Sequence, residues 1–236
     1  MIVLALDTTT PEGSHAIAGP GDRVVERAGE AERSHEARLP GDLMALLAAE
    51  GLSLGEIDAY AVATGPGSFT GLRVGIATMQ GLAFASGRPL IGVSALDALA
   101  TLGRADAAMT PDATGTMRLA TWVDAWRGQV FAALYDERQV IEPPSVETPR
   151  AILTRLAGSR LFFIGDGAAA HADEIRETLG RQAVLCAPVA PRLAGTIGRM
   201  AAGALRAGHR PPPQAVRPLY VRRPDAELSR RAGTGR

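Results

Sequence analysis

Short apolar runs separated by turn residues dominate the start of the chain. Runs over residues 2–6, 14–18 and 23–27 are too short for helices, and threonine, proline and glycine separate them. Each run therefore predicts a strand, and together they predict a strand meander. Two further apolar runs, over residues 57–63 and 90–93, predict two more buried strands.

Two helical patterns lie between these strands. Residues 34–47 place leucines on one helical face, with Ser34 as a candidate cap and with Pro40, which should delay or kink the helix. From Thr70 to Ala85, apolar side chains surround most of the helix, and its glycines permit close approach by another element. This second helix therefore requires packing partners on more than one side.

The rest of the chain repeats the alternation of strands and helices. The predicted strands lie over residues 119–123, 130–135, 161–164 and 184–185, and the predicted helices lie near residues 94–99, 150–156, 169–179 and 192–207. Strands that are followed by alternating helices and strands indicate an α/β fold, in which helices flank mixed sheets.

A run of small and polar residues between Gly103 and Gly115 indicates a domain boundary. We therefore expect a first domain over residues 1–105 and a second over residues 106–222, with the last helix able to pack back on the first domain. The final residues, 223–236, offer little to bury and are expected to be disordered.

Charge is balanced over the whole chain. The 236 residues include 25 basic and 25 acidic side chains, every basic one is an arginine, and the pI is about 6.9. This balance gives no reason to expect a global affinity for nucleic acid or for an anionic membrane. Any contact with RNA must come from a local patch or through a partner.

Missing residue types exclude several kinds of chemistry. The chain has no lysine, which a P-loop needs to reach phosphates and a Schiff-base enzyme needs as its amine. The single cysteine, Cys186, cannot form an internal disulfide, and four scattered histidines do not suggest a metal site. We expect the histidines to lie at the surface or to cap helices. Without a leader or a long apolar stretch, the chain is expected to be cytoplasmic.

The stretch LALDTTT places a carboxylate and hydroxyls at the end of the first predicted strand. Ligands of open α/β sheets bind at the carboxyl ends of strands, so Asp7, Thr8 and Thr9 are candidates for holding phosphate or a hydrated magnesium ion. The alternative is a local turn in which these side chains satisfy backbone donors. The motif alone leaves both interpretations open.

A glycine-rich turn, GPGSFTGLRVG, precedes the helix that begins near Thr70. Backbone amides of Gly65, Gly67 and Ser68 are candidates for binding an anion at the helix N-terminus. However, the glycine spacing is not that of a P-loop or a dinucleotide-binding loop, and Ser68 does not lie in a nucleophile elbow. We therefore interpret the turn as the rigid entrance to an interface helix, whose glycines pack closely against a partner.

A second glycine-containing turn, IGDGA, follows the apolar run over 161–164. It places Gly165 and Gly167 before a helix late in the chain, and this turn and the threonine-rich turn early in the chain, facing each other across a domain cleft, would suit a nucleotide.

The stretch VDAWRGQVF brings Asp124 and Arg127 to the end of a predicted strand. The pair either faces the cleft or forms a hairpin turn with solvated charges, and the sequence leaves this open. Trp122 and Trp126 are predicted to share one face of the strand, where an exposed tryptophan would indicate a contact surface.

Taken together, these stretches resemble the TsaB family of bacterial tRNA threonylcarbamoyladenosine biosynthesis proteins. The likeness runs through LALDTTT, GPGSFTGLRVGIATMQGLAFASGRPLIGVSALDALA, VDAWRGQVF, IGDGA and PLYVRRPDAE, and so covers nearly the whole chain apart from the tail. It implies the fold of the actin, sugar-kinase and Hsp70 ATPase class (ASKHA), with two RNase H-like domains. It also implies a degenerate adenosine motif, because Asp166 stands where ATP-binding relatives have glycine. The vestigial nucleotide site would comprise Asp7, Thr8, Thr9, Gly65, Gly67, Ser68, Gly165 and Gly167.

The resemblance further implies a subunit without catalysis. TsaD, the catalytic paralogue, carries paired metal-binding histidines after the strand that follows the glycine turn, whereas this chain reads GVSALDALA there. Loss of these ligands removes the Lewis acid of the reaction, so no catalytic residue, no metal and no cofactor beyond a weakly bound nucleotide is expected. TsaB proteins pair with TsaD, the ATPase TsaE joins the pair, and tRNA meets the complex.

The implied pairing surface lies on the helices over residues 35–47 and 70–85, which would form a helical bundle across the interface. The same surface would support a homodimer when TsaD is absent. The expected contact residues are Leu39, Leu43, Leu47, Phe69, Leu72, Arg73, Ile76 and Met79. Trp126 and Phe131 depart from the family pattern, which commonly has arginine and tyrosine at these positions, so the roles of those two residues stay open.

Two alternatives come from other classes of protein. An ATP-binding phosphotransferase of the sugar-kinase and actin class would use Asp7 as a magnesium-linked acid in the cleft between the two domains. A glycopeptidase follows only from an older name of the wider superfamily, and the missing histidine pair speaks against it.

Overall fold

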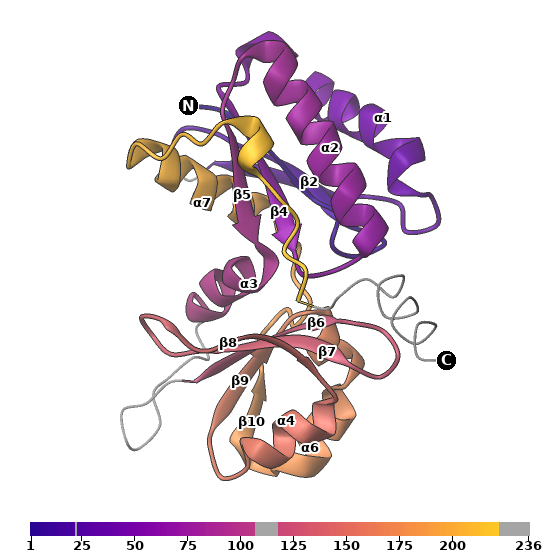
Figure 1. Ribbon diagram of the computed structural model, residues 1–236, viewed down its shortest axis with the longest axis vertical. Coiled ribbons are helices and arrows are strands. Elements are labelled where there is room, and N and C mark those ends of the chain that lie inside the picture. The colour runs from indigo at the N-terminus through magenta and orange to yellow at the C-terminus, as the bar shows by residue number, and fades with distance from the viewer. Residues whose placement is uncertain (22, 107–117, 222–236) are drawn as a thin grey trace, which may run out of the picture.

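The computed structural model describes residues 1–21, 23–106 and 118–221. They form two lobes, each built on a mixed five-stranded sheet with flanking helices (Figure 1). This arrangement confirms the predicted fold class. The tail over 223–236 and most of the predicted boundary run between Gly103 and Gly115 lie outside the described residues.

The first sheet has the strand order β3-β2-β1-β4-β5. The strand β1 lies at its centre, antiparallel to β2 and parallel to β4, so its carboxyl end opens toward the second lobe. The strands are β1 (Val3–Asp7), β2 (Ser14–Ala18), β3 (Val24–Ala28), β4 (Ala59–Gly65) and β5 (Leu90–Ser94).

Helices cover both faces of the first sheet. The helices α1 (His35–Ala49) and α2 (Phe69–Ser86) lie on one face, and α7 (Ala194–Arg206) packs on the other against β1, β2, β4 and β5 (Figure 1). Ser34 takes the N-cap position of α1, although its side chain makes no capping bond. The predicted delay at Pro40 is wrong: α1 begins at His35 and continues through the proline, because Pro40 is exposed while the leucines beside it are buried.

The second sheet has the order β10-β9-β6-β7-β8. Its elements are β6 (Leu119–Asp124), β7 (Val130–Tyr135), β8 (Val140–Glu147), α4 (Pro149–Arg155), β9 (Leu161–Ile164), α5 (Asp166–Ala170), α6 (Ala172–Leu179) and β10 (Ala183–Leu185). The sequence did not predict β8, which contains Pro143 and Pro144 and lies at the edge of the sheet, where missing N–H donors are tolerated. The helix predicted over 169–179 is two helices that meet at His171.

The helix α3 (Ala95–Arg104) connects the lobes (Figure 1). Its Leu96 and Leu99 belong to a core cluster that also contains strand residues of both sheets. The hydroxyl of Tyr135 on β7 donates to Asp97 Oδ1 at 2.8 Å. The two lobes therefore share one continuous core around α3.

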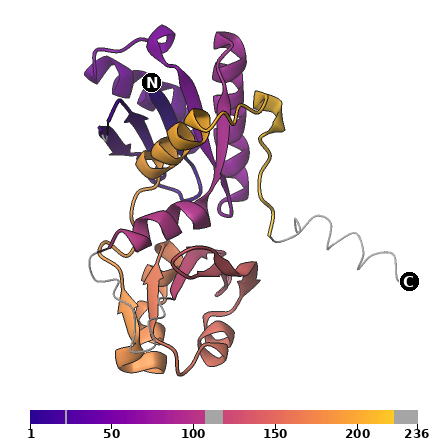
Figure 2. The same cartoon turned by 90° about the vertical axis from the view of Figure 1, so that its left-hand side faces the viewer.

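The last described residues, 208–221, form what we call the C-terminal strap, which runs from α7 to α2 (Figure 2). Gln80 Nε2 on α2 donates to the carbonyls of Pro213 and Val216, at 3.0 and 3.1 Å, and Leu219 N donates to Thr64 O at 2.7 Å. Short 3-10 turns complete the described chain, at Leu54–Glu56, Gly180–Gln182 and Pro213–Ala215.

Candidate functional site

A cleft of about 360 Å³ opens between the lobes, where the carboxyl ends of β1 and β6 approach each other. Asp7, Thr9 and Thr10 line it from the first lobe, Val123 and Asp166 from the second. The turn before α7 closes one side with the segment 190–193. The cleft is thus where the sequence placed a vestigial nucleotide site, and its chemistry decides what can bind there.

Asp7 is buried at the base of the cleft. Its side chain is only 4% exposed, and its Oδ1 accepts from Thr9 N at 2.9 Å and from Thr9 Oγ1 at 2.7 Å. Burial raises the pKa of Asp7 to about 6. Thr9 therefore acts as the local turn partner that the sequence left as one of two interpretations, and an ionised Asp7 is costly to keep there.

Asp166 brings a second carboxylate to the cleft. Its Oδ1 accepts from the backbone N–H of Asp124 at 3.2 Å and of Gly167 at 3.0 Å, and burial raises its pKa. The negative charge of Asp166 also raises the pKa of Asp7. The two lobes thus present carboxylates to the same space, which repels a polyphosphate that carries no cation.

The glycines of the turn before α2 pack against the threonine turn after β1. A Cβ on Gly67 would lie 2.6 Å from Thr9 Cβ, and a Cβ on Gly71 or Gly75 would collide with Thr8. Ser68 N donates to Thr9 O at 2.8 Å, and Gly71 N donates to Ser68 Oγ at 3.2 Å. The amides of Ser68 and Gly71 are therefore satisfied within the lobe. The prediction that these glycines pack against a partner is wrong.

The second glycine turn is also filled by the protein itself. A Cβ on Gly165 would collide with Trp122 O, and one on Gly167 would lie 2.9 Å from the carbonyl carbon of Val123. Of the residues predicted for the nucleotide site, only Asp7 and Thr9 line the cleft. The residues that do not line it are Thr8, Gly65, Gly67, Ser68, Gly165 and Gly167. The residues present do not fit a nucleotide polyphosphate.

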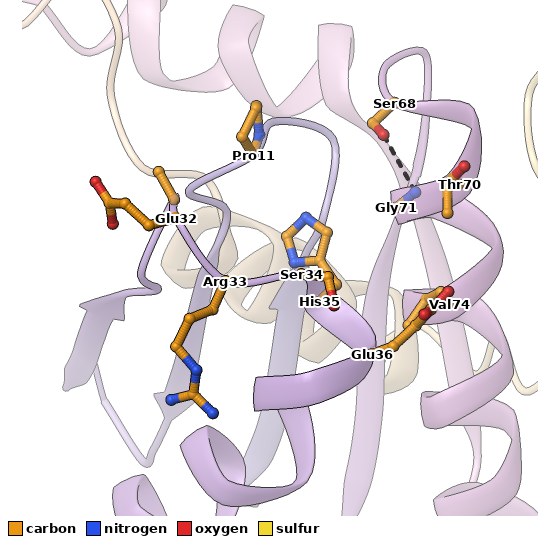
Figure 3. A pocket seen from close by; sticks show the side chains of 11 residues that line it. Pro11, Glu32, Arg33, Ser34, His35, Glu36, Ser68, Thr70, Gly71 and Val74 are labelled. Carbon is orange, nitrogen blue, oxygen red and sulfur yellow. Dashed lines mark hydrogen bonds between the residues drawn. The ribbon is translucent and has the colours of Figure 1, made fainter.

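Ser68 instead borders a second hollow, of about 300 Å³, between the first turns of α1 and α2 (Figure 3). Ser34 and His35 face it from α1, and Thr70 and Val74 from α2. Glu32, Arg33 and Glu36 add charges of both signs to its lining. The hollow is open to solvent on the same side of the first lobe as α1 and α2.

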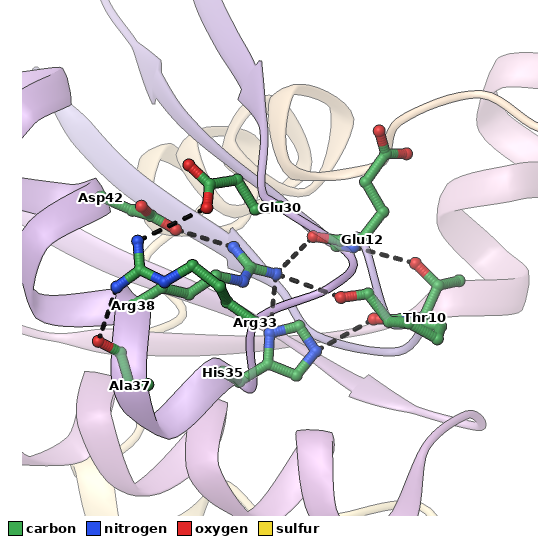
Figure 4. Close-up of polar contacts among 10 residues, drawn as sticks. Thr10, Glu12, Glu30, Arg33, His35, Ala37, Arg38 and Asp42 are labelled. Atoms are coloured by element: carbon green, nitrogen blue, oxygen red, sulfur yellow. Dashed lines mark hydrogen bonds and ion pairs between the residues drawn. The ribbon is translucent and has the colours of Figure 1, made fainter.

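Arg38 is a buried residue that sequence reasoning missed (Figure 4). Its guanidinium pairs with Asp42 Oδ2 at 2.7 Å and donates to the carbonyls of Pro11 and Glu12. His35 Nε2 lies 3.0 Å from Thr10 O, and its Nδ1 lies 2.9 Å from the guanidinium, which fits a neutral ring that donates through Nε2. Burial lowers the pKa of His35 accordingly. This cluster ties the cleft loop to α1, and the i, i+4 pairing of Arg38 with Asp42 was the available signal.

Most residues predicted to contact a partner lie in the core of the first lobe. Six of them are at most 4% exposed: Leu39, Leu43, Leu47, Leu72, Ile76 and Met79. All but Leu72 belong to the core cluster between these helices and the sheet. Assigning these side chains to an interface was wrong, because helices that cover a sheet bury their most apolar stripe against it. Phe69 and Arg73 are exposed, as a contact would require.

The outer side of the same helices is apolar and small. We call it the α1–α2 face, and its exposed residues are Ala37, Met44, Ala45 and Ala48 on α1, and Ala77, Gly81, Phe84 and Ala85 on α2. Met44 is 52% exposed and Phe84 is 84% exposed. Such exposure of large apolar side chains among small ones is typical of a contact surface.

Other candidate residues fall at turns or in cores. Trp122 is fully buried on β6, whereas Trp126 lies 45% exposed in the hairpin turn after it, so the prediction that they share a strand face is wrong. Trp126 and Arg127 both have positive φ, which is uncommon for residues other than glycine. His15, expected at the surface, is 4% exposed on β2. Phe131 is buried on β7.

Neither a metal centre nor a membrane span is found within residues 1–21, 23–106 and 118–221. These residues contain no group of three or more histidine, cysteine, aspartate or glutamate side chains placed to hold a metal ion. None of the helices in the described part of the chain combines the length and apolarity needed to cross a bilayer.

Comparisons with known proteins agree on one family. The family model described as TsaD, tRNA N6-adenosine threonylcarbamoyltransferase, matches residues 28–230. A Haemophilus influenzae protein, tRNA threonylcarbamoyladenosine biosynthesis protein TsaB, is 32% identical over 186 residues, which is 76% of this chain and 78% of that protein.

Two further comparisons cover more of the chain. An uncharacterized Mycobacterium leprae protein is 31% identical over 235 residues, which is 96% of this chain and 56% of that protein, so the chain spans about half the length of this relative. The solved structure of YeaZ from Pseudomonas aeruginosa superposes with a TM-score of 0.73 at 27% identity, over 93% of this chain and 99% of that one. This match confirms the fold across both lobes.

Proposed function

Since the chain belongs to the TsaB family of tRNA threonylcarbamoyladenosine biosynthesis proteins, we propose that it is a subunit of the machinery that makes this tRNA modification and that it pairs with a TsaD-family protein. The partner performs the threonylcarbamoyl transfer, and this chain supplies a docking surface. The α1–α2 face carries the proposal, because Phe84 leaves 84% of its side chain in solvent among small residues.

The proposal assigns no catalytic step to this chain. By the resemblance, TsaD holds its metal-binding histidines at the start of the helix that corresponds to α3. Here that helix begins with Ala95 and Leu96, which are fully buried in the core shared by the lobes, followed by Leu99. The side chains of Ala95 and Leu96 carry no atom that can ligate a metal.

The α1–α2 face suits the matching helices of a partner. Alanine and glycine at Ala45, Ala48, Ala77 and Gly81 allow helix axes to approach closely, since helices pack at about 8–10 Å depending on the side chains between them. Met44 and Phe84 supply the large apolar contacts that are enriched at the centre of interfaces.

Light scattering of the full chain mixed with its TsaD-family partner tests the pairing. We expect a species with the summed mass of the two chains at micromolar concentration. The double variant Met44→Asp/Phe84→Asp should weaken association by at least about tenfold, because charges cannot be desolvated in an apolar interface. Val140→Asp/Ile141→Asp is the matched control, since Val140 is 42% and Ile141 is 41% exposed on β8 in the other lobe.

Three outcomes separate the parts of the proposal. If the wild-type chains remain separate at micromolar concentration, the proposed pairing is wrong. If this chain alone has twice its own mass and the double variant does not, a homodimer uses the same face. The family resemblance also leads us to propose that a TsaE-type ATPase joins the pair, and a third component in the mixed species measures this directly.

A further inference from the structure

Acidic residues are absent from two long stretches of this neutral chain. Residues 59–96 and 178–224 contain no aspartate or glutamate, although the whole chain has 25 acidic side chains. The first stretch contains β4, α2 and β5, and the second contains β10, α7 and the C-terminal strap. The zero net charge therefore conceals a strong segregation of charge.

The two stretches adjoin in space around β5, the edge strand of the first sheet. The helix α7 lies on one face of the sheet and α2 on the other, and the strap passes from one to the other (Figures 1 and 2). Val216 of the strap contacts Gly92 of β5, and Gln80 of α2 holds the strap by two hydrogen bonds. We name six exposed arginines of α2, the turn before β5, α7 and the strap the basic band: Arg73, Arg88, Arg199, Arg206, Arg210 and Arg217.

The arginines of the basic band have no carboxylate partner within the described residues. Arg73 donates to the hydroxyl of Tyr220 at 3.1 Å, and Arg199 donates to Thr196 Oγ1 at 3.4 Å. In contrast, two exposed arginines of the second lobe are neutralised locally: Arg155 pairs with Glu142 and Glu147, and Arg176 pairs with Asp173. No carboxylate within the described residues neutralises the positive electrostatic potential of the band, so this potential can attract an anionic ligand.

An exposed aromatic stack lies at one end of the band. The Arg73 guanidinium lies 3.9 Å from the Phe69 ring centroid, and the rings of Phe69 and Tyr220 are 5.3 Å apart. Phe69 is 39% exposed and Tyr220 is 42% exposed. Proteins that recognise RNA combine such stacks with arginines, because unpaired bases stack on aromatic and guanidinium planes.

We propose that the basic band binds tRNA directly, through its phosphates, and that the Phe69–Tyr220 stack receives an unpaired base. The inference rests on the proposed function, which makes tRNA the polyanion present in the complex. It goes beyond that function, since there the tRNA meets this chain only through the partner. Exposed guanidiniums without a carboxylate partner attract phosphates, and the stack favours RNA over a membrane surface.

Salt-dependent binding of a fluorescently labelled tRNA transcript tests the proposal, with the full chain alone and paired with its TsaD-family partner. The band variant is Arg199→Gln/Arg210→Gln/Arg217→Gln. The matched control, Arg150→Gln/Arg155→Gln/Arg176→Gln, removes the same charge from exposed positions of the second lobe. Neither variant touches the α1–α2 face.

We expect the band variant to bind the tRNA at least about tenfold more weakly and to lower the slope of log affinity against log salt by about 3, one unit per phosphate contact. The control should change affinity less than about twofold, because its arginines lie outside the band. Tyr220→Ala should weaken binding severalfold, whereas Tyr220→Phe, which retains the ring, should retain it.

Equal effects of the two triple variants, or no effect of either, overturn the proposal, as does equally tight binding of duplex DNA of the same length. Light scattering separates this failure from that of the proposed function. If the chains pair and the band variant still binds tRNA normally, the inference is wrong and the proposed pairing stands. If the wild-type chains do not pair but tRNA binds through the band, the pairing is wrong and the inference stands.

Discussion

The two sides of α2 differ in chemistry: the inner side packs against the threonine turn that leads into the interlobe cleft, and the outer side forms part of the α1–α2 face. On its inner side, α2 places Gly71 and Gly75 directly against the threonine turn, and the cleft beyond contains the buried carboxylates of Asp7 and Asp166. On its outer side, α2 presents Gly81 among exposed apolar residues, with open space around it. The difference shows that glycines on one side of α2 serve close packing within the lobe, whereas Gly81 on the other side lies on an open surface.

The largest predicted contrast is between the two sides of α2. Leu72→Asp buries a charge where the side chain is 1% exposed, so we expect a loss of about 4 kcal/mol or more in the free energy of unfolding. Phe84→Asp, at an 84% exposed position, should change that free energy by less than about 0.5 kcal/mol. Urea unfolding of the isolated chain measures both free energies. Similar losses in the two variants would show that the inner and outer sides of α2 do not differ as described.

A smaller contrast concerns the glycines of α2. A methyl group on Gly71 collides with the backbone of Thr8, so Gly71→Ala should cost about 2 kcal/mol of stability. No atom lies within 4 Å of the position that a methyl group on Gly81 would occupy, so Gly81→Ala should stabilise the helix by about 0.5–1 kcal/mol. Thermal unfolding of the two variants checks the signs. If Gly71→Ala is as stable as the wild type, the turn is not packed as described.

The smallest predicted effect comes from the cleft carboxylate. The pKa of Asp7 is about 6 in the folded chain and 3.8 in the unfolded chain. Between pH 3.8 and pH 6, the folded chain therefore holds a proton on Asp7 that the unfolded chain has lost. The stability that this proton provides is complete below about pH 4 and is lost as the pH rises through 6. Asp7→Asn should therefore raise the free energy of unfolding at pH 7.5 by about 1–2 kcal/mol.

Stability profiles between pH 4 and pH 7.5 measure this effect. The gain of Asp7→Asn over the wild type should grow as the pH rises and vanish near pH 4. An asparagine variant that is less stable than the wild type at pH 7.5 would show that the ionised carboxylate is needed there, as a bound cation would require.

The sequence predicted the order of most elements because their periodicity is local. The runs over 14–18, 130–135 and 161–164 are strands with the bounds predicted or nearly so. The edge strand β8 was not predicted because Pro143 and Pro144 lower its strand propensity. Only its pairing with β7 compensates for that low propensity. That compensation is a tertiary contact, which no local pattern contains.

The faces of the helices could not be predicted in the same way. Apolar residues surround α2, so its sequence does not say which stripe meets the sheet and which meets solvent. The prediction therefore chose Leu72, Ile76 and Met79, the most apolar residues, and these are the ones that the sheet buries. Arg38 was missed for the converse reason, since a charged residue is expected outside unless its partners are known.

Hydrogen exchange of the full chain, with and without its TsaD-family partner, tests most directly whether this protein works through its surface rather than its cleft. The account predicts slower amide exchange in α1 and α2 on pairing, with the cleft turns over residues 7–13 and 165–168 unchanged. Protection confined to those cleft turns, with α1 and α2 exchanging as in the free chain, would contradict it.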